Sequence, residues 1–247
     1  MDGHGTARAV LLSGLLLAGG TILAGSGNPP EGWLLVRRPD TVEFMARING
    51  AGFDGSWMMR GYHAVVWKGG RMSGAALLVA EVSDLQVLGA LESLGAKPGD
   101  NLPMDTWDER RDHDHTAPDR IIAGPGIEIL LRLPGGPPLT PLTAVLDDPG
   151  RRGLEMRFGG NRHNIPEWKS GCVVCLYSCP GSKVGNARYT VRDYVRGTTR
   201  FRTRKGALPP DGTRVGVVFR IQKPPPSKLP GAASRSIAAT APSAPEA

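Results

Sequence analysis

The chain has 247 residues, of which 40% are hydrophobic and 21% charged, a composition that excludes disordered and fibrous proteins and is typical of a globular one. Its 34 glycines and 22 prolines favour short elements joined by turns over long helices. The formal net charge of +7 is uneven. Residues 31–150 hold 11 Lys and Arg against 17 Asp and Glu, whereas residues 151–205 hold 13 against 3.

The first 27 residues predict export. Arg8 precedes an uncharged run from Ala9 to Gly27, and the small residues at 24–26 suit a signal peptidase. The run also has nearly the length of a membrane anchor, so residues 1–27 are interpreted as a signal peptide or an N-terminal anchor, with a buried helix as the alternative. We expect an exported protein, either periplasmic or membrane-anchored and facing the periplasm. No second arginine accompanies Arg8, so transport in the folded state is not indicated.

Residues 28–222 form the predicted folded body, a single domain, and residues 223–247 a disordered tail rich in Pro, Ala and Ser. Seven stretches predict strands because they are short, β-branched or alternating, and bounded by turn residues. They are residues 33–38, 41–48, 62–68, 76–82, 127–133, 154–160 and 213–221. Residues 187–195 fit either a strand or a short helix.

One amphipathic helix is predicted at about residues 83–95. Ser83 and Gln86 have the spacing of a capping box, and Gly95 supplies a left-handed end. An apolar stripe is expected from the leucines at 85, 88, 91 and 94. A capped helix within a chain of mostly antiparallel strands predicts the α+β class, with the helix packed on one face of a sheet.

Three runs together resemble the YdjY-like domain family of bacterial exported proteins. They are "HAVVWKGGRMSGAALLVAEVSDLQVLGALESLGAKPGDNL", "SGCVVCLYSCPGSKVGNARYTVRDY" and "LPPDGTRVGVVFRI". The resemblance covers roughly residues 40–222. It implies export and an α+β fold, and it transfers no catalytic residue because the family has no settled activity.

All three cysteines lie in one stretch with the spacing C-x2-C-x3-C-P: Cys172, Cys175 and Cys179. This spacing matches the last three ligands of a bacterial ferredoxin run, with Lys169 where the first ligand would stand. An iron–sulfur cluster is therefore one hypothesis. The predicted unfolded export argues against it, because such clusters are normally loaded in the cytoplasm.

Other chemistries remain open for the same cysteines. In an oxidising compartment, two of them are expected to form a structural disulfide and leave a spare thiol. Thiolates also select copper(I) or zinc, which can be loaded after export. The absence of any cofactor is an equal alternative.

Histidines add further candidate ligands. His163 stands nine residues before Cys172 and would complete a set of three cysteines and one histidine. His113 and His115 alternate with aspartates and would project to one side of an extended segment, where they could share a divalent cation. A solvated acidic loop is the alternative for this second pair.

The positive charge of region 151–205 limits the kinds of partner that we expect the protein to bind. Export excludes nucleic acid and leaves an acidic protein partner, an anionic membrane surface, or solvated strand faces. Arg200, Arg202 and Arg204 alternate as on one face of a strand.

No reaction is predicted from the sequence. The sequence favours a redox, metal or iron–sulfur role in electron transfer or the cell envelope, and the alternative is a non-catalytic binding or assembly module braced by a disulfide.

Overall fold

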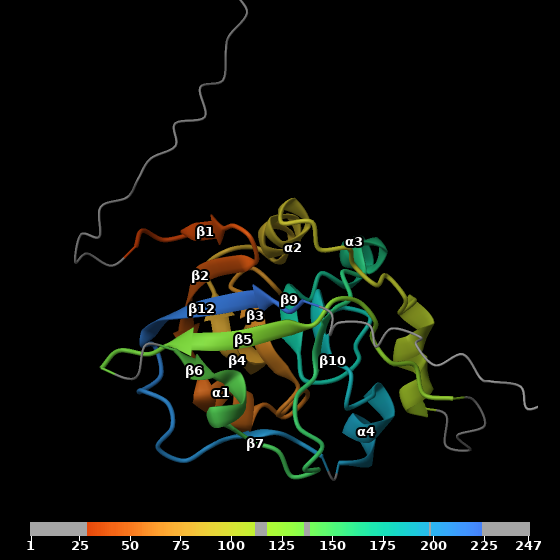
Figure 1. The fold of residues 1–247 in the computed structure, drawn as a ribbon. Helices are drawn as coiled ribbons and strands as arrows, with labels where there is room; N and C mark the ends of the chain where they lie inside the picture. The colour runs from red at the N-terminus through yellow and green to blue at the C-terminus, as the bar shows by residue number, and fades with distance from the viewer. Residues whose placement is uncertain (1–28, 112–117, 136–138, 198, 224–247) are drawn as a thin grey trace, which may run out of the picture.

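A computed structural model describes residues 29–111, 118–135, 139–197 and 199–223. The predicted export segment, the C-terminal tail, and His113 and His115 lie outside these residues. The described part is a mixed α/β structure, mostly sheet with few helices, which is consistent with the predicted α+β class (Figure 1). No helix within it reaches the length and apolarity needed to span a bilayer.

Most strands belong to one ten-stranded sheet, in the order β6-β5-β12-β2-β4-β3-β9-β10-β8, with β1 pairing on β2. The seven predicted strands each coincide with a strand of this sheet. The sheet strands are β1 (Leu34–Arg37), β2 (Thr41–Ile48), β3 (His63–Trp67), β4 (Ala76–Ala80), β5 (Ile127–Arg132), β6 (Thr140–Pro141), β8 (Met156–Phe158), β9 (Cys172–Cys175), β10 (Val184–Asn186) and β12 (Arg214–Ile221). A second sheet pairs β7 (Leu146–Asp147) with β11 (Arg202–Thr203).

The described strand pairs are antiparallel except for two parallel ones, β3 with β4 and β9 with β10. The long sheet also curls back on itself. An isolated bridge joins Gly126, just before β5, to Arg157 of β8, and the Phe158 N–H donates to the Pro125 carbonyl at 2.8 Å. This curvature places β3 and β9 between the two ends of the sheet, with apolar side chains buried around them.

Short helices flank the sheet: α1 (Gly50–Gly55), α2 (Asp84–Ser93), α3 (Ile165–Trp168) and α4 (Val191–Arg196). Four 3-10 turns complete the described elements: η1 (Ser73–Ala75), η2 (Met104–Arg111), η3 (Leu142–Ala144) and η4 (Arg162–Asn164). In Figure 1, α2 lies above the strands and α1 below them.

Helix α2 has the N-terminal capping box expected from its sequence. The Gln86 N–H donates to Ser83 Oγ at 3.1 Å, and the Ser83 N–H donates to Gln86 Oε1 at 2.8 Å. The helix contacts β2 and β9. Its buried apolar residues are Val87, Leu88, Ala90 and Leu91. The predicted stripe was wrong at Leu85, which is 47% exposed because it lies one position past the face that begins with Asp84.

A second capping box resolves residues 187–195 in favour of a helix. The Thr190 N–H donates to Asp193 Oδ2 at 2.9 Å, and the Asp193 N–H donates to Thr190 Oγ1 at 3.4 Å. Helix α4 therefore starts at Val191. The Arg152 guanidinium binds the Asp193 carboxylate in a two-pronged ion pair, at 3.0 and 2.5 Å.

We expect Arg152→Met to make the protein more sensitive to acid. Burial alone would raise the pKa of Asp193, but Arg152 and the Thr190 N–H outweigh it and hold that pKa below its usual value. A carboxyl with a lowered folded pKa stabilises the fold above its unfolded pKa, and this contribution disappears as pH falls through the folded pKa. Without Arg152, acid unfolding followed by circular dichroism should begin at a higher pH.

The matched control for this experiment is Arg204→Met, which removes an ion pair with Asp147 in which both side chains are about half exposed. Exposed pairs contribute little to stability, so this variant should unfold in acid like the wild type. Equal acid midpoints for the two variants would contradict the role assigned to Arg152.

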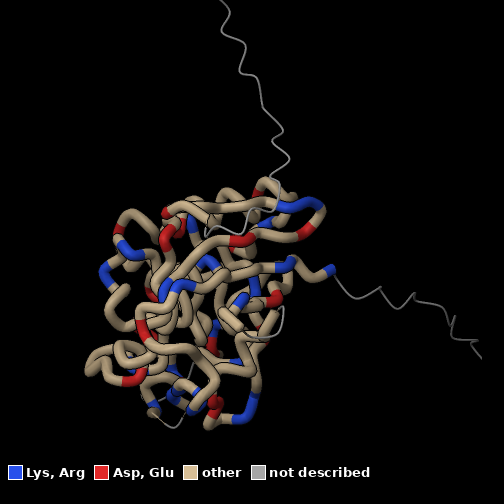
Figure 2. Tube along the Cα trace, turned by 90° about the vertical axis from the view of Figure 1, so that its left-hand side faces the viewer, with Lys and Arg blue, Asp and Glu red and all other residues tan. Residues whose placement is uncertain are grey.

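The positive charge of region 151–205 is less concentrated in the structure than the sequence suggests. The strand predicted from the alternating arginines is limited to β11, because Arg200 packs against the Tyr194 ring and Arg204 pairs with Asp147. Figure 2, which views the molecule from the left-hand side of Figure 1, shows basic and acidic positions interspersed over that side. Several arginines of region 151–205 are bound to carboxylates: Arg152, Arg157, Arg162, Arg188, Arg192, Arg196 and Arg204.

Candidate functional site

The pairing of β3 with β9 gathers two cysteines around one histidine. Residues three apart on a regular strand point to opposite faces, so Cys172 and Cys175 would normally diverge. Here the register between β3 and β9 shifts twice, as happens at a β-bulge. As a result, His63 Nδ1 lies 3.3 Å from Cys172 Sγ and 3.5 Å from Cys175 Sγ. The three ligand atoms all lie within 4.8 Å of one another.

The third cysteine lies in the loop that follows β9. The Cys179 thiol is one of the neighbouring groups that raise the pKa of Cys175, and the Gly181 N–H donates to Cys179 Sγ at 3.4 Å. All three cysteines are free thiols in the structure, so the disulfide considered in the sequence analysis is not formed here. The three cysteines and His63 therefore form one cluster, which we call the Cys/His cluster.

The loop between β9 and β10 is unusual because it is fully buried. Every residue from 171 to 186 is buried, so its backbone groups need partners inside the protein. Asparagine side chains supply many of them: Asn164 Nδ2 donates to the Pro180 carbonyl at 2.8 Å, and Asn186 Nδ2 donates to the Leu176 carbonyl at 3.3 Å. Side chains from outside the loop thus fix the position of Cys179.

The surroundings of the cluster shift the pKa values of Cys172 and Cys175 in opposite directions. Burial raises the pKa of Cys172, but a hydrogen bond from Cys175 and the nearby His63 and Lys183 outweigh it, and the pKa falls to about 6. Burial and the neighbouring thiols raise the pKa of Cys175 well above its usual value. Burial and the adjacent cysteines also raise the pKa of Tyr62. The surroundings therefore favour the thiolate form at Cys172 and the neutral thiol at Cys175.

A cavity of about 370 Å³ leads to the cluster. His63 and Cys179 are among its lining residues, together with Tyr62 and the indoles of Trp107 and Trp168. The cluster itself is almost fully shielded from solvent: Cys172 and Cys175 are 0% exposed, Cys179 1% and His63 3%. We call this cavity the entry pocket, because His63 and Cys179 form part of its wall.

The donor atoms of the cluster fit a soft metal ion. Cysteine sulfur and imidazole nitrogen are the ligands that zinc and copper(I) prefer. His63 Nε2 is buried and has no hydrogen-bond partner among the described residues, so none of them holds the ring through that nitrogen. The Nδ1 atom is the nitrogen that faces the sulfurs.

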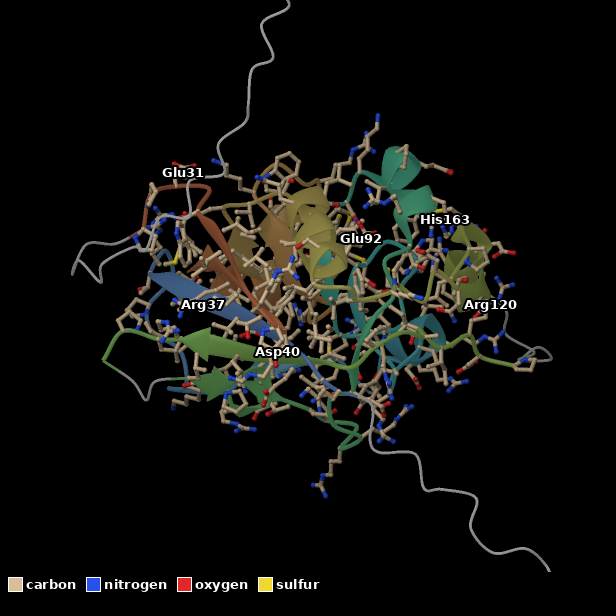
Figure 3. The ribbon with its side chains drawn as sticks, turned by 45° about the horizontal axis from the view of Figure 1, so that its top comes forward. Glu31, Arg37, Asp40, Glu92, Arg120 and His163 are labelled. Atoms are coloured by element: carbon tan, nitrogen blue, oxygen red, sulfur yellow. The ribbon has the colours of Figure 1, made fainter. Side chains whose placement is uncertain are left out.

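The histidines proposed from the sequence are placed elsewhere. His163 is exposed on η4, beside α3 (Figure 3), and it is not among the residues whose ligand atoms gather with those of Cys172 and Cys175. His113 and His115 lie outside the described residues. The histidine that does join the cysteines, His63, was missed, because the sequence shows it only as part of an apolar strand. Its distance of 109 residues from Cys172 leaves no local motif that could have indicated it.

Close backbone packing holds the start of β9 in place. Gly171 has a φ of +69°, and a Cβ atom there would lie 2.5 Å from the Gly70 Cα atom. We expect Gly171→Ala to destabilise the protein by about 2 kcal/mol or more, from the left-handed backbone and the clash with Gly70. Urea unfolding would measure this.

Gly55→Ala serves as the matched control, because nothing lies within 4 Å of a Cβ atom at that position and its φ is not in the left-handed region. That substitution should leave the free energy of unfolding almost unchanged. A Gly171→Ala protein as stable as Gly55→Ala would show that this backbone contact does not constrain β9.

The fold and the cluster define a mixed α/β protein with a buried thiol–imidazole site beside the entry pocket. The chain belongs to the YdjY domain family, whose model matches residues 37–220. It is also 31% identical over 182 residues to the protein of Escherichia coli (strain K12) named "Uncharacterized protein YdjY", an alignment covering 73% of this chain and 75% of the relative. No solved structure matches the chain.

Proposed function

We propose that the protein is an exported metal-binding protein that holds one soft metal ion in the Cys/His cluster. The observation that carries this proposal is the meeting of His63 Nδ1 with two cysteine sulfurs at 3.3 and 3.5 Å. In a tetrahedral zinc site, metal–sulfur bonds of about 2.3 Å and metal–nitrogen bonds of about 2.0 Å separate nitrogen from sulfur by about 3.5 Å. The distances in the cluster are close to this value.

The same distances favour a single ion over an iron–sulfur cluster. A four-iron cluster takes one thiolate on each iron, so its cysteines are spaced around a body of iron and sulfide atoms. Here the ligand atoms of His63, Cys172 and Cys175 all lie within 4.8 Å. Cys179 lies outside this set of three but acts on the Cys175 thiol, and it is the fourth ligand in this proposal.

Export remains part of the proposal and is supported by the sequence of residues 1–27 alone. It agrees with the single-ion site, because zinc or copper can be loaded after translocation. An acidic protein or an anionic membrane surface facing region 151–205 is also proposed. The ion pairs of Arg152, Arg188 and Arg204 reduce the charge available for such a partner.

Metal analysis of protein purified without oxygen tests the proposal. We expect one equivalent of zinc or copper for each chain, and one equivalent of cobalt(II) in the reloaded protein, with an intense sulfur-to-cobalt absorption band. Iron with equimolar acid-labile sulfide would overturn it in favour of an iron–sulfur protein. A metal-free protein that does not take up zinc, copper or cobalt and contains a disulfide would favour the assembly module.

A further inference from the structure

The entry pocket has walls of unusual chemistry for a route to a metal site. Besides the indoles of Trp107 and Trp168, it is lined by the thioether side chains of Met59 and Met72. Both methionines are partly buried and pack against the core. At its inner end the pocket reaches His63 and Cys179.

An ion that enters this pocket must shed most of its water before it reaches the thiols. The cost of moving an ion into a medium of low dielectric constant rises with the square of its charge, so a dication pays about four times the cost of a monocation of equal size. The two charged residues of the pocket, Arg71 and Glu167, are both exposed and of opposite sign. Together they give no net attraction for a dication.

A thioether sulfur replaces the water ligands of copper(I) more favourably than it replaces those of zinc. Methionine is a soft ligand, and soft ligands select copper(I). Two thioethers on the wall therefore offer intermediate ligands to a monovalent soft ion at the point where water is removed. Tyr62 adds a buried hydroxyl at the same pocket that makes no hydrogen bond among the described residues.

We propose that the ion of the Cys/His cluster is copper(I), and that Met59 and Met72 transfer it from the protein surface to His63 and Cys179. This inference rests on the proposed metal site, and it adds the identity of the ion and its route. It involves ligand exchange only, with copper remaining in the +1 state throughout.

The test compares Met59→Leu/Met72→Leu with the wild type, using the full chain without oxygen. Leucine keeps the apolar volume of methionine and removes the sulfur. Copper(I) is supplied as its bathocuproine complex with ascorbate present, and loss of the complex's colour is followed by stopped flow. We expect the double variant to load copper(I) about tenfold more slowly, which is the size of effect that removing groups around a metal site typically has. The final stoichiometry should be unchanged. Its loading with cobalt(II) should be unchanged.

Met45→Leu is the matched control, because Met45 is a buried methionine on β2 that does not line the pocket. It should load copper(I) at the wild-type rate. If the double variant also loads at that rate, or if the wild type retains zinc against an equal concentration of copper(I), the inference is overturned while the metal site stands. A wild type that binds neither ion would overturn the proposed function as well.

Discussion

Replacing Cys172 with serine is expected to weaken metal binding by a factor on the order of a hundred. Four protein ligands in a structural site share a binding free energy of about 10–16 kcal/mol, so the loss of one corresponds to about 3 kcal/mol. Cys172 lies 3.3 Å from His63 Nδ1 and is the thiol with the lowered pKa, at about 6. Serine retains the size of the side chain but has a neutral hydroxyl, a poor ligand for a soft ion. Competition with a metal chelator measures the change.

Two further variants give this measurement its controls. His163→Ala removes the exposed histidine of η4 and should leave affinity unchanged, although the sequence alone made His163 a candidate ligand. Cys179→Ser distinguishes a site of four ligands, where the loss resembles that of Cys172→Ser, from one of three, where it is small. Wild-type affinity in the Cys172→Ser protein, with its fold confirmed by circular dichroism, would contradict the proposed site.

Local patterns were sufficient to predict much of the fold. The seven strands follow from short apolar runs bounded by turn residues, and α2 begins where the Ser83 and Gln86 pair predicts it. Helix α4 was ambiguous from periodicity, yet its own capping residues, Thr190 and Asp193, have the same spacing. That signal was present in the sequence and would have decided the question.

The candidate site was only half predictable. The spacing of the cysteines pointed to a shared role, and the structure brings all three together. His63 depends on the pairing of β3 with β9, two strands more than a hundred residues apart, and strand partners are not encoded in any local pattern. The register shifts add a second obstacle, because regular strand geometry would have sent Cys172 and Cys175 to opposite faces.

Lys183→Met is expected to be strongly destabilising, costing about 3–5 kcal/mol. Lys183 Nζ lies 2.7 Å from Asp84 Oδ2, with the two side chains 2% and 7% exposed. Removing the cation leaves the Asp84 carboxylate buried without its partner, at a cost greater than the attraction that is lost. Urea unfolding of the variant, with and without bound metal, measures the change.

A second variant distinguishes the loss of the Lys183–Asp84 attraction from the cost of leaving the Asp84 carboxylate buried without a partner. The double variant Lys183→Met/Asp84→Leu replaces both charges by apolar groups of similar size, which is often nearly neutral. It should therefore recover most of the stability lost in Lys183→Met, apart from about 0.5 kcal/mol for the missing acidic residue in the first turn of α2. A double variant as unstable as the sum of the two single variants would show that the pair is not coupled.

The ion pair between Arg162 and Glu92 provides the matched control. It joins η4 to the C-terminal end of α2, at 2.7 Å, but its side chains are 54% and 35% exposed. Arg162→Met should cost less than about 1 kcal/mol, because water screens the charge that remains. Since Lys183 also lowers the pKa of Cys172, the Lys183→Met protein should hold its metal more weakly at neutral pH, and Arg162→Met should not. The buried pair thus connects the stability of α2 to the chemistry of β9, and the difference between these two variants measures that connection.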